Sequence, residues 1–111
     1  MEEEFYSIIN KDNDVIILAN LFHNFCKDNN KVKAFELIKS GLLDLSFIYH
    51  DTNRTLLTVA CIYDMEEVVI ELLKTKKISI KSKDIFGKTA IEYARQNKMH
   101  SAVEMMIEMI I

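Results

Sequence analysis

The sequence contains no proline, no tryptophan and only two glycines among its 111 residues. Turns must therefore be made mainly by Asn, Asp, Ser and Lys rather than by proline and glycine. The two cysteines, Cys26 and Cys61, are too few for the disulfide framework of a small secreted domain. We therefore expect reduced thiols and a cytoplasmic location.

Long hydrophobic runs are also missing, because no apolar stretch approaches the roughly 18 residues that a membrane-spanning helix needs. The first residues, Met1–Glu4, are acidic where a secretory signal would be basic. We therefore expect no membrane partner. Half of the residues are hydrophobic and the net charge is -3, which is typical of one globular domain with no general attraction for nucleic acid.

The sequence lacks the residue arrangements that usually carry catalysis. His23, His50 and His100 have no metal-ligating residue at a suitable helical spacing. Neither cysteine has a nearby cation that would activate its thiol, and no Ser/His/Asp set or glycine-rich phosphate loop is present. We expect a protein that is not an enzyme and that holds neither a metal nor a cofactor.

Five lysines lie close together in the stretch from residue 74 to residue 83: Lys74, Lys76, Lys77, Lys81 and Lys83. A basic patch of this kind could bind nucleic acid or an acidic protein. However, neither arginine nor aromatic residues interleave with the lysines, which disfavours stacking on bases. Lysines at the end of a helix also suit its dipole, so a solvated helix end and loop is the favoured interpretation.

Helical spacing of apolar residues divides the chain into an acidic and apolar N-terminal segment, residues 1–14, and one domain, residues 15–111. Residues 5–9 could form one or two helical turns, and residues 10–14 predict a turn and a cap for a helix from Val15. The domain holds three similar copies, at about 15–49, 50–83 and 84–111. Matched residues of the last two copies lie 34 positions apart: Thr55 and Thr89, Leu57 and Ile91, Ala60 and Ala94, Met65 and Met99, Val69 and Val103. This period fits more than one class of helical repeat.

Four segments distinguish between these classes. Asp84–Ile91, followed by Ala94, resembles the ankyrin pattern in which Asp, Gly and Thr lead into a first helix. Thr55–Cys61 resembles the same helix start, Glu67–Leu73 resembles the core of the second ankyrin helix, and Ala34–Gly41 resembles its end. The aromatic signature of tetratricopeptide repeats is missing. The resemblance covers residues 15–111 and implies an all-α, ankyrin-type helix-turn-helix solenoid with short hairpin-like loops.

The resemblance also assigns roles at the turns. The threonine at the head of each first helix is expected to cap that helix through its hydroxyl. Gly87 should supply a positive φ before the third copy, and Asn53 holds the matching place in the second. Asp64 and Lys98 stand where the family usually has glycine between the two helices. A positive φ at each would cost about 1 kcal/mol.

Ankyrin repeats imply a protein–protein interaction module that binds a partner protein through a concave face of loop tips and first helices. An alternative is a dedicated inhibitor or immunity-type protein that occludes an enzyme or toxin. We expect Phe86, Ile85 and Tyr63 to dominate, because aromatic anchors dominate interfaces. Transferred to this sequence, the predicted contact residues are Asp51, Thr52, Arg54, Ile62, Tyr63, Lys83, Ile85, Phe86, Lys88, Gln96 and Asn97.

The last helix predicts a second surface. Its core side is expected to carry Val103, Met106, Ile107 and Ile110, which leaves Met105, Met109 and Ile111 on an apolar outer side. A terminal repeat normally has a polar outer side. This surface is therefore predicted to contact a partner, a second copy of the chain or a further repeat, unless the N-terminal segment covers it.

Overall fold

The computed structural model describes residues 11–111, and the expected helical turns over residues 5–9 lie outside this part of the chain. The described residues are mainly helical, which confirms the all-α fold class, and no helix among them is long and apolar enough to span a membrane. The elements, in chain order, are α2 (Lys11–Lys27), α3 (Lys31–Lys39), β1 (Ile48–Tyr49), β2 (Arg54–Thr55), α4 (Leu56–Ile62), α5 (Glu66–Lys74), α6 (Ala90–Gln96) and α7 (His100–Ile110).

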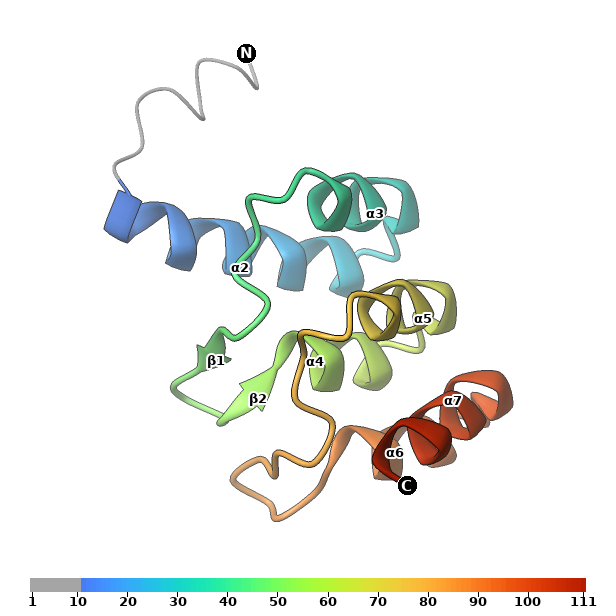
Figure 1. Ribbon diagram of the computed structural model, residues 1–111. Coiled ribbons are helices and arrows are strands. Elements are labelled where there is room, and N and C mark those ends of the chain that lie inside the picture. The colour runs from blue at the N-terminus through green and yellow to red at the C-terminus, as the bar shows by residue number, and fades with distance from the viewer. Residues whose placement is uncertain (1–10) are drawn as a thin grey trace.

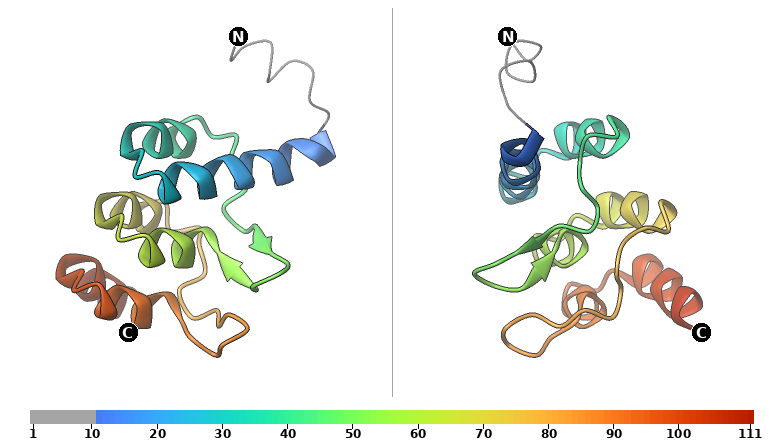
Figure 2. Two further views of the ribbon diagram at one scale, coloured as in Figure 1. Left: turned by 180° about the vertical axis from the view of Figure 1, so that it is seen from behind. Right: turned by 60° about the vertical axis from the view of Figure 1, so that its left-hand side comes forward.

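The helices form three pairs, α2 with α3, α4 with α5 and α6 with α7, and the pairs stack in chain order (Figure 1). The first helices of the pairs make one layer, in which α4 lies between α2 and α6. The second helices make the other layer, in which α5 lies between α3 and α7 (Figure 2). Each pair therefore buries its apolar faces against its partner helix and against the neighbouring pairs.

The first helix begins earlier than the sequence suggested. Helix α2 starts at Lys11, so the prediction of a turn over residues 10–14 is wrong for residues 11–14, which are helical. Asp14 lies in the first turn of α2, where the helix dipole favours an acidic residue. Because Asp and Asn suit both a turn and a helix start, the sequence pattern placed the boundary about one helical turn too late.

A left-handed residue closes the turn between the two helices of every pair. Asn29, Asp64 and Lys98 have φ values of 58°, 57° and 57°, which confirms the expectation for Asp64 and Lys98. After each of them the next amide turns back to the preceding helix, as in the 3.0 Å bond from Met65 N to the carbonyl of Ala60. The three pairs are therefore closed by one shared backbone geometry.

The helix starts in the second and third copies differ in their caps. Thr55 caps α4 as expected, because its Oγ1 accepts a hydrogen bond of 3.2 Å from the amide of Thr58. Thr89 precedes α6 but makes no side-chain cap, and its hydroxyl instead donates to Glu92 Oε1 at 3.5 Å. The expected positive φ is found at both Asn53 (57°) and Gly87 (76°).

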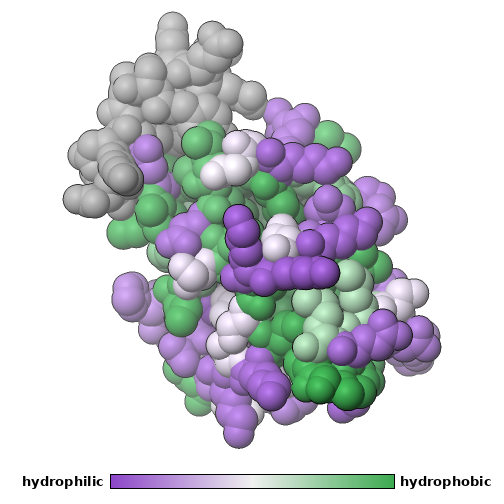
Figure 3. Space-filling view, in the orientation of Figure 1, coloured by the Kyte–Doolittle hydropathy of each residue, from purple (hydrophilic) through white to green (hydrophobic). Residues whose placement is uncertain are grey.

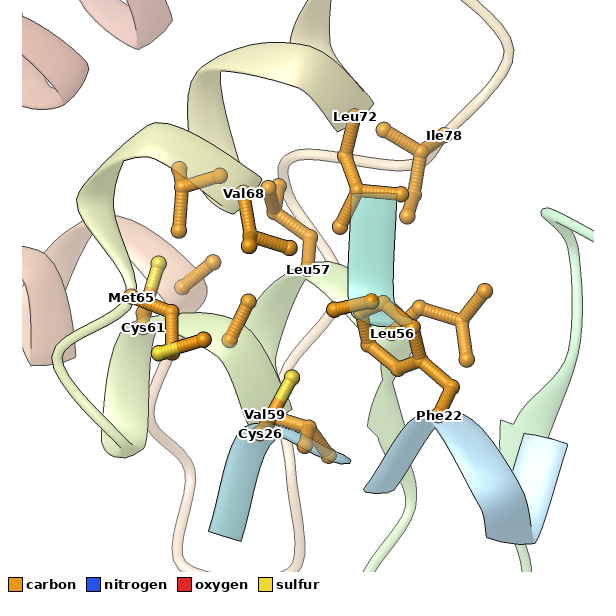
Figure 4. Packing of buried hydrophobic residues seen from close by; sticks show 14 of the residues in the cluster. Phe22, Cys26, Leu56, Leu57, Val59, Cys61, Met65, Val68, Leu72 and Ile78 are labelled. Atoms are coloured by element: carbon orange, nitrogen blue, oxygen red, sulfur yellow. The ribbon is translucent and has the colours of Figure 1, made fainter. Parts of the chain in front are cut away.

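The core lies between the two layers and is richest in the central pair (Figure 4). Leu72 of α5 is fully buried, and Ile78 packs into the same core from the loop that follows α5. Ala60 and Ala94 are fully buried where α4 and α6 pack together, since small side chains let the two helices approach closely. Cys61 is a buried free thiol whose pKa is raised by burial, which agrees with an inert core residue.

The last helix differs in detail from its predicted faces. Met105 is partly buried and packs against the core, whereas Ile110, placed on the core side, is 38% exposed because it lies beyond the last layer of packed residues. Met109 and Ile111 are exposed as expected. The apolar surface is therefore confined to the C-terminal end of α7.

The outer side of the third pair carries charge at positions that the second pair buries. Glu92 and Arg95 are exposed, and they occupy the places of Thr58 and Cys61, which are buried between the second and third pairs. Glu104 likewise replaces the partly buried Ile70. A further pair stacked along α6 would therefore bury these charges.

We predict that Leu72→Ala lowers the free energy of unfolding by about 2–5 kcal/mol, because it leaves a cavity among fully buried residues of a small core. Urea unfolding followed by circular dichroism measures the change. Val32 of α3 is 64% exposed and provides the control. Val32→Ala should alter stability by no more than about 0.5 kcal/mol, and an equal loss in both variants would contradict the assigned core.

Candidate protein-binding surface

Two loops project side by side from the first helices of the second and third pairs (Figures 1 and 2). The first finger, residues 48–55, is the antiparallel hairpin of β1 and β2, in which Tyr49 pairs with Arg54. The second finger, residues 83–89, is closed by a bridge between Lys83 and Thr89. Tyr49 ties the first finger to α2, because its hydroxyl donates to the carbonyl oxygen of Ala19.

Backbone and side-chain hydrogen bonds join the two fingers to each other. The amide of Ile85 donates to the carbonyl of Thr52 at 2.9 Å, and Asn53 Nδ2 donates to the carbonyl of Lys83 at 2.9 Å. Each finger therefore contributes both a donor and an acceptor to the contact between them. Because these two bonds join the turn of the first finger to the second finger, they limit the independent movement of both fingers.

The Asp84 carboxylate is the centre of this contact. It is buried, with 6% of the residue exposed. Its Oδ1 accepts the amides of Phe86 and Lys88, each at 3.0 Å, which fixes the turn of the second finger. Its Oδ2 accepts Arg54 Nε of the first finger at 3.3 Å and the hydroxyl of Tyr93 from α6. One side chain thus connects both fingers to the third helix pair.

The environment of Asp84 favours its ionised form. Burial on its own would raise the pKa of this carboxyl by desolvation. The hydrogen bonds from the Tyr93 hydroxyl, the amides of Lys88 and Phe86, and Arg54 outweigh that effect, and the pKa lies below its ordinary value of 3.8. The charge of Asp84 therefore contributes to stability at neutral pH, and this contribution is lost as the pH falls through the lowered pKa.

Phe86 and Ile85 occupy the tip of the second finger and are 67% and 59% exposed. The Arg54 guanidinium lies 5.7 Å from the Phe86 ring and also 5.7 Å from the Tyr93 ring, and Lys88 Nζ lies 5.5 Å from the Tyr93 ring. Arg54 and Lys88 are therefore already engaged within the fold. Phe86 rests on Arg54 by one face and leaves most of its surface open.

The predicted residues at the ends of the first helices lie in a different setting. Asn97 Nδ2 donates to the carbonyls of Cys61 and Ile62 at 2.6 and 3.3 Å, so its amide joins the second and third pairs. Tyr63 is partly buried, and its ring meets His23 edge-on with centroids 5.4 Å apart. These contacts give Asn97 and Tyr63 a role in packing, and contact with a partner remains a prediction for both.

A small hollow of about 200 Å³ lies between α2 and the base of the first finger; its lining includes Asn20, His23, Thr52 and Arg54. Burial lowers the pKa of His23 by desolvation, and the positive charges of Lys27 and Arg54 lower it further. The lining also includes Asp51 and Tyr49, so the hollow is a partly aromatic recess that holds one cation, Arg54, and one anion, Asp51.

The structure separates the predicted contact residues by exposure. Asp51, Lys83, Ile85, Phe86 and Gln96 are exposed, while the others are partly buried: Thr52, Arg54, Ile62, Tyr63, Lys88 and Asn97. Sequence reasoning missed Asp84 and Tyr93, which organise the fingers. Asp84 opens the repeat motif and could have been recognised as a turn former, but nothing in the sequence indicated that Tyr93 would reach it.

A comparison with solved structures supports the fold, and no comparison shows a family. No family model matches the chain. A stretch of 90 residues, 81% of the chain, is 29% identical to part of the tyrosine-protein kinase Shark of Drosophila melanogaster. The chain also superimposes, with a TM-score of 0.65 and 23% identity over 79% of its length, on a chain from the complex of the predatory endopeptidase Bd0816 of Bdellovibrio bacteriovorus with the immunity protein Bd3460. The region matched by this chain spans 9% of the length of the kinase and 45% of the length of the matched structural chain.

We predict that Asp84→Asn destabilises the protein by at least about 1 kcal/mol at neutral pH, because a buried, charge-assisted hydrogen-bond network loses its charge. The deficit relative to the wild type should begin to shrink below about pH 4, the ordinary pKa of an aspartate, and should be smallest once the pH has fallen through the lowered pKa of Asp84. Urea unfolding across this pH range measures both effects. Asp51→Asn, at an exposed position of the first finger, is the control. A deficit that does not change with pH would show that the Asp84 charge has no such role.

Proposed function

We propose that the chain is an ankyrin-type solenoid domain that binds another protein through its two fingers and the adjoining first helices. Three features support the assignment: the 34-residue spacing, the stacked helix pairs, and a left-handed residue at the same place in each finger. The sequence segments that resemble ankyrin repeats lie on the helices and fingers where that family would have them.

The tip of the second finger is the observation that carries the binding proposal. Phe86 and Ile85 expose apolar surface that contributes little to the core. The backbone beneath them is nevertheless held by the Asp84 carboxylate and by the first finger. An aromatic side chain on a rigid support loses little conformational entropy when a partner covers it, which favours tight binding.

The more specific form of this proposal is an inhibitor or immunity-type protein that occludes an enzyme. It is supported by the fold similarity to a chain from the complex of an endopeptidase with an immunity protein. It is also supported by the way the two fingers project from the stack (Figure 1), with Ile85 and Phe86 exposed on the second finger where an enzyme cleft could accept them. We propose no catalytic activity, since the described residues include no cluster of metal-binding side chains and both cysteines are buried.

We predict that Ile85→Ser with Phe86→Ala weakens partner binding at least about tenfold while leaving the melting temperature unchanged. Ile85 is chosen as the second position because Tyr63 packs against His23 and its removal would also affect stability. The tagged wild-type chain is used to recover its partner from the native host, and the dissociation constants of both variants are then compared.

Val32→Ala on α3 provides the control, because it trims an exposed apolar side chain on the layer of second helices, which is not part of the proposed surface. It should bind like the wild type. Equal affinity of the double variant and the wild type would contradict the finger surface. If the recovered partner is an enzyme, loss of its activity at one equivalent of the chain would support the inhibitor over a general adaptor.

A further inference from the structure

A second recess lies away from the fingers, between the loop after α5 and the C-terminal end of α7. It has a volume of about 410 Å³ and is lined by Lys76, Ile78, Ser79, Ile80, Lys81, Met109 and Ile110. That volume lies within the roughly 300–1,000 Å³ typical of ligand sites. In Figure 3 the hydrophobic surface at the end of α7 adjoins hydrophilic side chains. We call this recess the α7 groove; its floor is apolar and its charged rim is entirely basic.

Among residues 14–111, no acidic side chain forms an ion pair with the lysines around the α7 groove. The ion pairs found among residues 14–111 join other residues: Lys31 with Glu67, Lys33 with Glu36, and Arg54 with Asp84. Lys76 and Lys81 are exposed on the rim, and Lys77 is exposed next to Lys76 in the sequence. A ligand that combines apolar side chains with adjacent carboxylates would match both the floor and the rim.

The sequence contains one segment with that composition. Residues 2–4 are three consecutive glutamates, and Phe5, Tyr6, Ile8 and Ile9 follow them. This segment lies outside the described residues. Its run of acidic residues is the densest in the chain, as residues 74–83 are the densest basic stretch, so the two are the strongest electrostatic complements that the chain offers itself.

We propose that residues 2–9 of one copy dock in the α7 groove of a second copy. The glutamates pair with Lys76 and Lys81, while the aromatic and isoleucine side chains cover Ile80 and the exposed end of α7. The contact protects apolar surface that neither the core nor the fingers cover. It also neutralises lysines that are otherwise unpaired.

The geometry favours a contact between copies over one within a copy. The segment leads into α2 at one end of the stack, and the α7 groove lies at the other end (Figures 1 and 2). The longest dimension of the molecule is 41 Å. Ten fully extended residues span at most roughly 35 Å, and they would also have to follow the surface around the helices. A second copy meets no such limit.

This arrangement joins two different surfaces and is therefore head-to-tail. It closes only if the rotation between copies forms a ring, and otherwise it continues as a chain of copies. Because exposed charges contribute to it, association should weaken as salt concentration rises. The fingers stay free in such an assembly, so partner binding and self-association can be tested separately.

Charge reversal in both halves of the contact provides the test, with sedimentation velocity of the full chain as the readout. The wild type should associate as its concentration rises, and an excess of a synthetic peptide of residues 1–10 should dissociate it. Two variants, Lys76→Glu with Lys81→Glu and Glu3→Lys with Glu4→Lys, should each associate at least about tenfold more weakly. Mixed in equal amounts, they should associate again, because each then meets an oppositely charged surface.

Lys74→Glu with Lys83→Glu is the matched control, since it makes the same charge change on the same stretch outside the lining of the α7 groove. It should associate like the wild type. Thermal unfolding checks that each variant is folded. If reversal at Lys76 and Lys81 lowers the melting temperature, the Glu3 and Glu4 variant and the peptide competition decide the question.

Three results would overturn the proposal: a wild type that stays monomeric and ignores the peptide, unchanged association in either charge-reversed variant, or no recovery on mixing. Association that survives both reversals but disappears in Met109→Ser would instead identify direct packing of α7 against α7 of the second copy.

Discussion

The stack depends on left-handed backbone at each point where the chain turns back on itself. With only two glycines and no proline, most of these positions are occupied by other residues: Asn29, Asn53, Asp64, Lys76 and Lys98, together with Gly41 and Gly87. A residue with a Cβ in this conformation costs about 1–2 kcal/mol. The fold tolerates this cost because each turn brings two apolar helix faces together. The burial of a side chain such as Leu72 or Leu57 stabilises the fold by more than one such turn destabilises it. Turn geometry and core packing are therefore coupled, and neither would persist alone in a chain of this size.

The same coupling explains why the fingers are rigid. A loop of seven or eight residues would ordinarily be among the more mobile parts of a small domain. In place of an apolar core, the fingers are held together by Asp84. Its single carboxylate accepts hydrogen bonds from two amides, a guanidinium and a phenol. Since such a network favours one arrangement of its donors, the exposed Phe86 side chain is supported by a fixed backbone rather than by apolar packing.

Sequence patterns predicted the structural features that follow from residue spacing within a repeat. They missed the contacts between residues that lie far apart in the sequence. Equivalent helix faces recur 34 residues apart in the second and third pairs, so these pairs, their turns and the burial of Ala60 and Ala94 could be recognised directly. The bond between Arg54 and Asp84 joins residues 30 positions apart in two loops, and no local pattern indicates it. The exposure of Ile110 was missed for a related reason, because helical periodicity shows which side of α7 is apolar but not where the neighbouring core ends.

The charges on the rest of the third pair indicate whether the apolar end of α7 is a stacking face for a further pair. If its apolar residues were a stacking face for a further pair, the neighbouring positions of α6 would be uncharged, as Thr58 and Cys61 are in α4. They are instead Glu92 and Arg95, which would lose hydration without gaining a partner. Stacking therefore does not account for the exposed Met109 and Ile111. What remains beside them is a recess with an apolar floor and a lysine rim, whose complement must be both apolar and acidic.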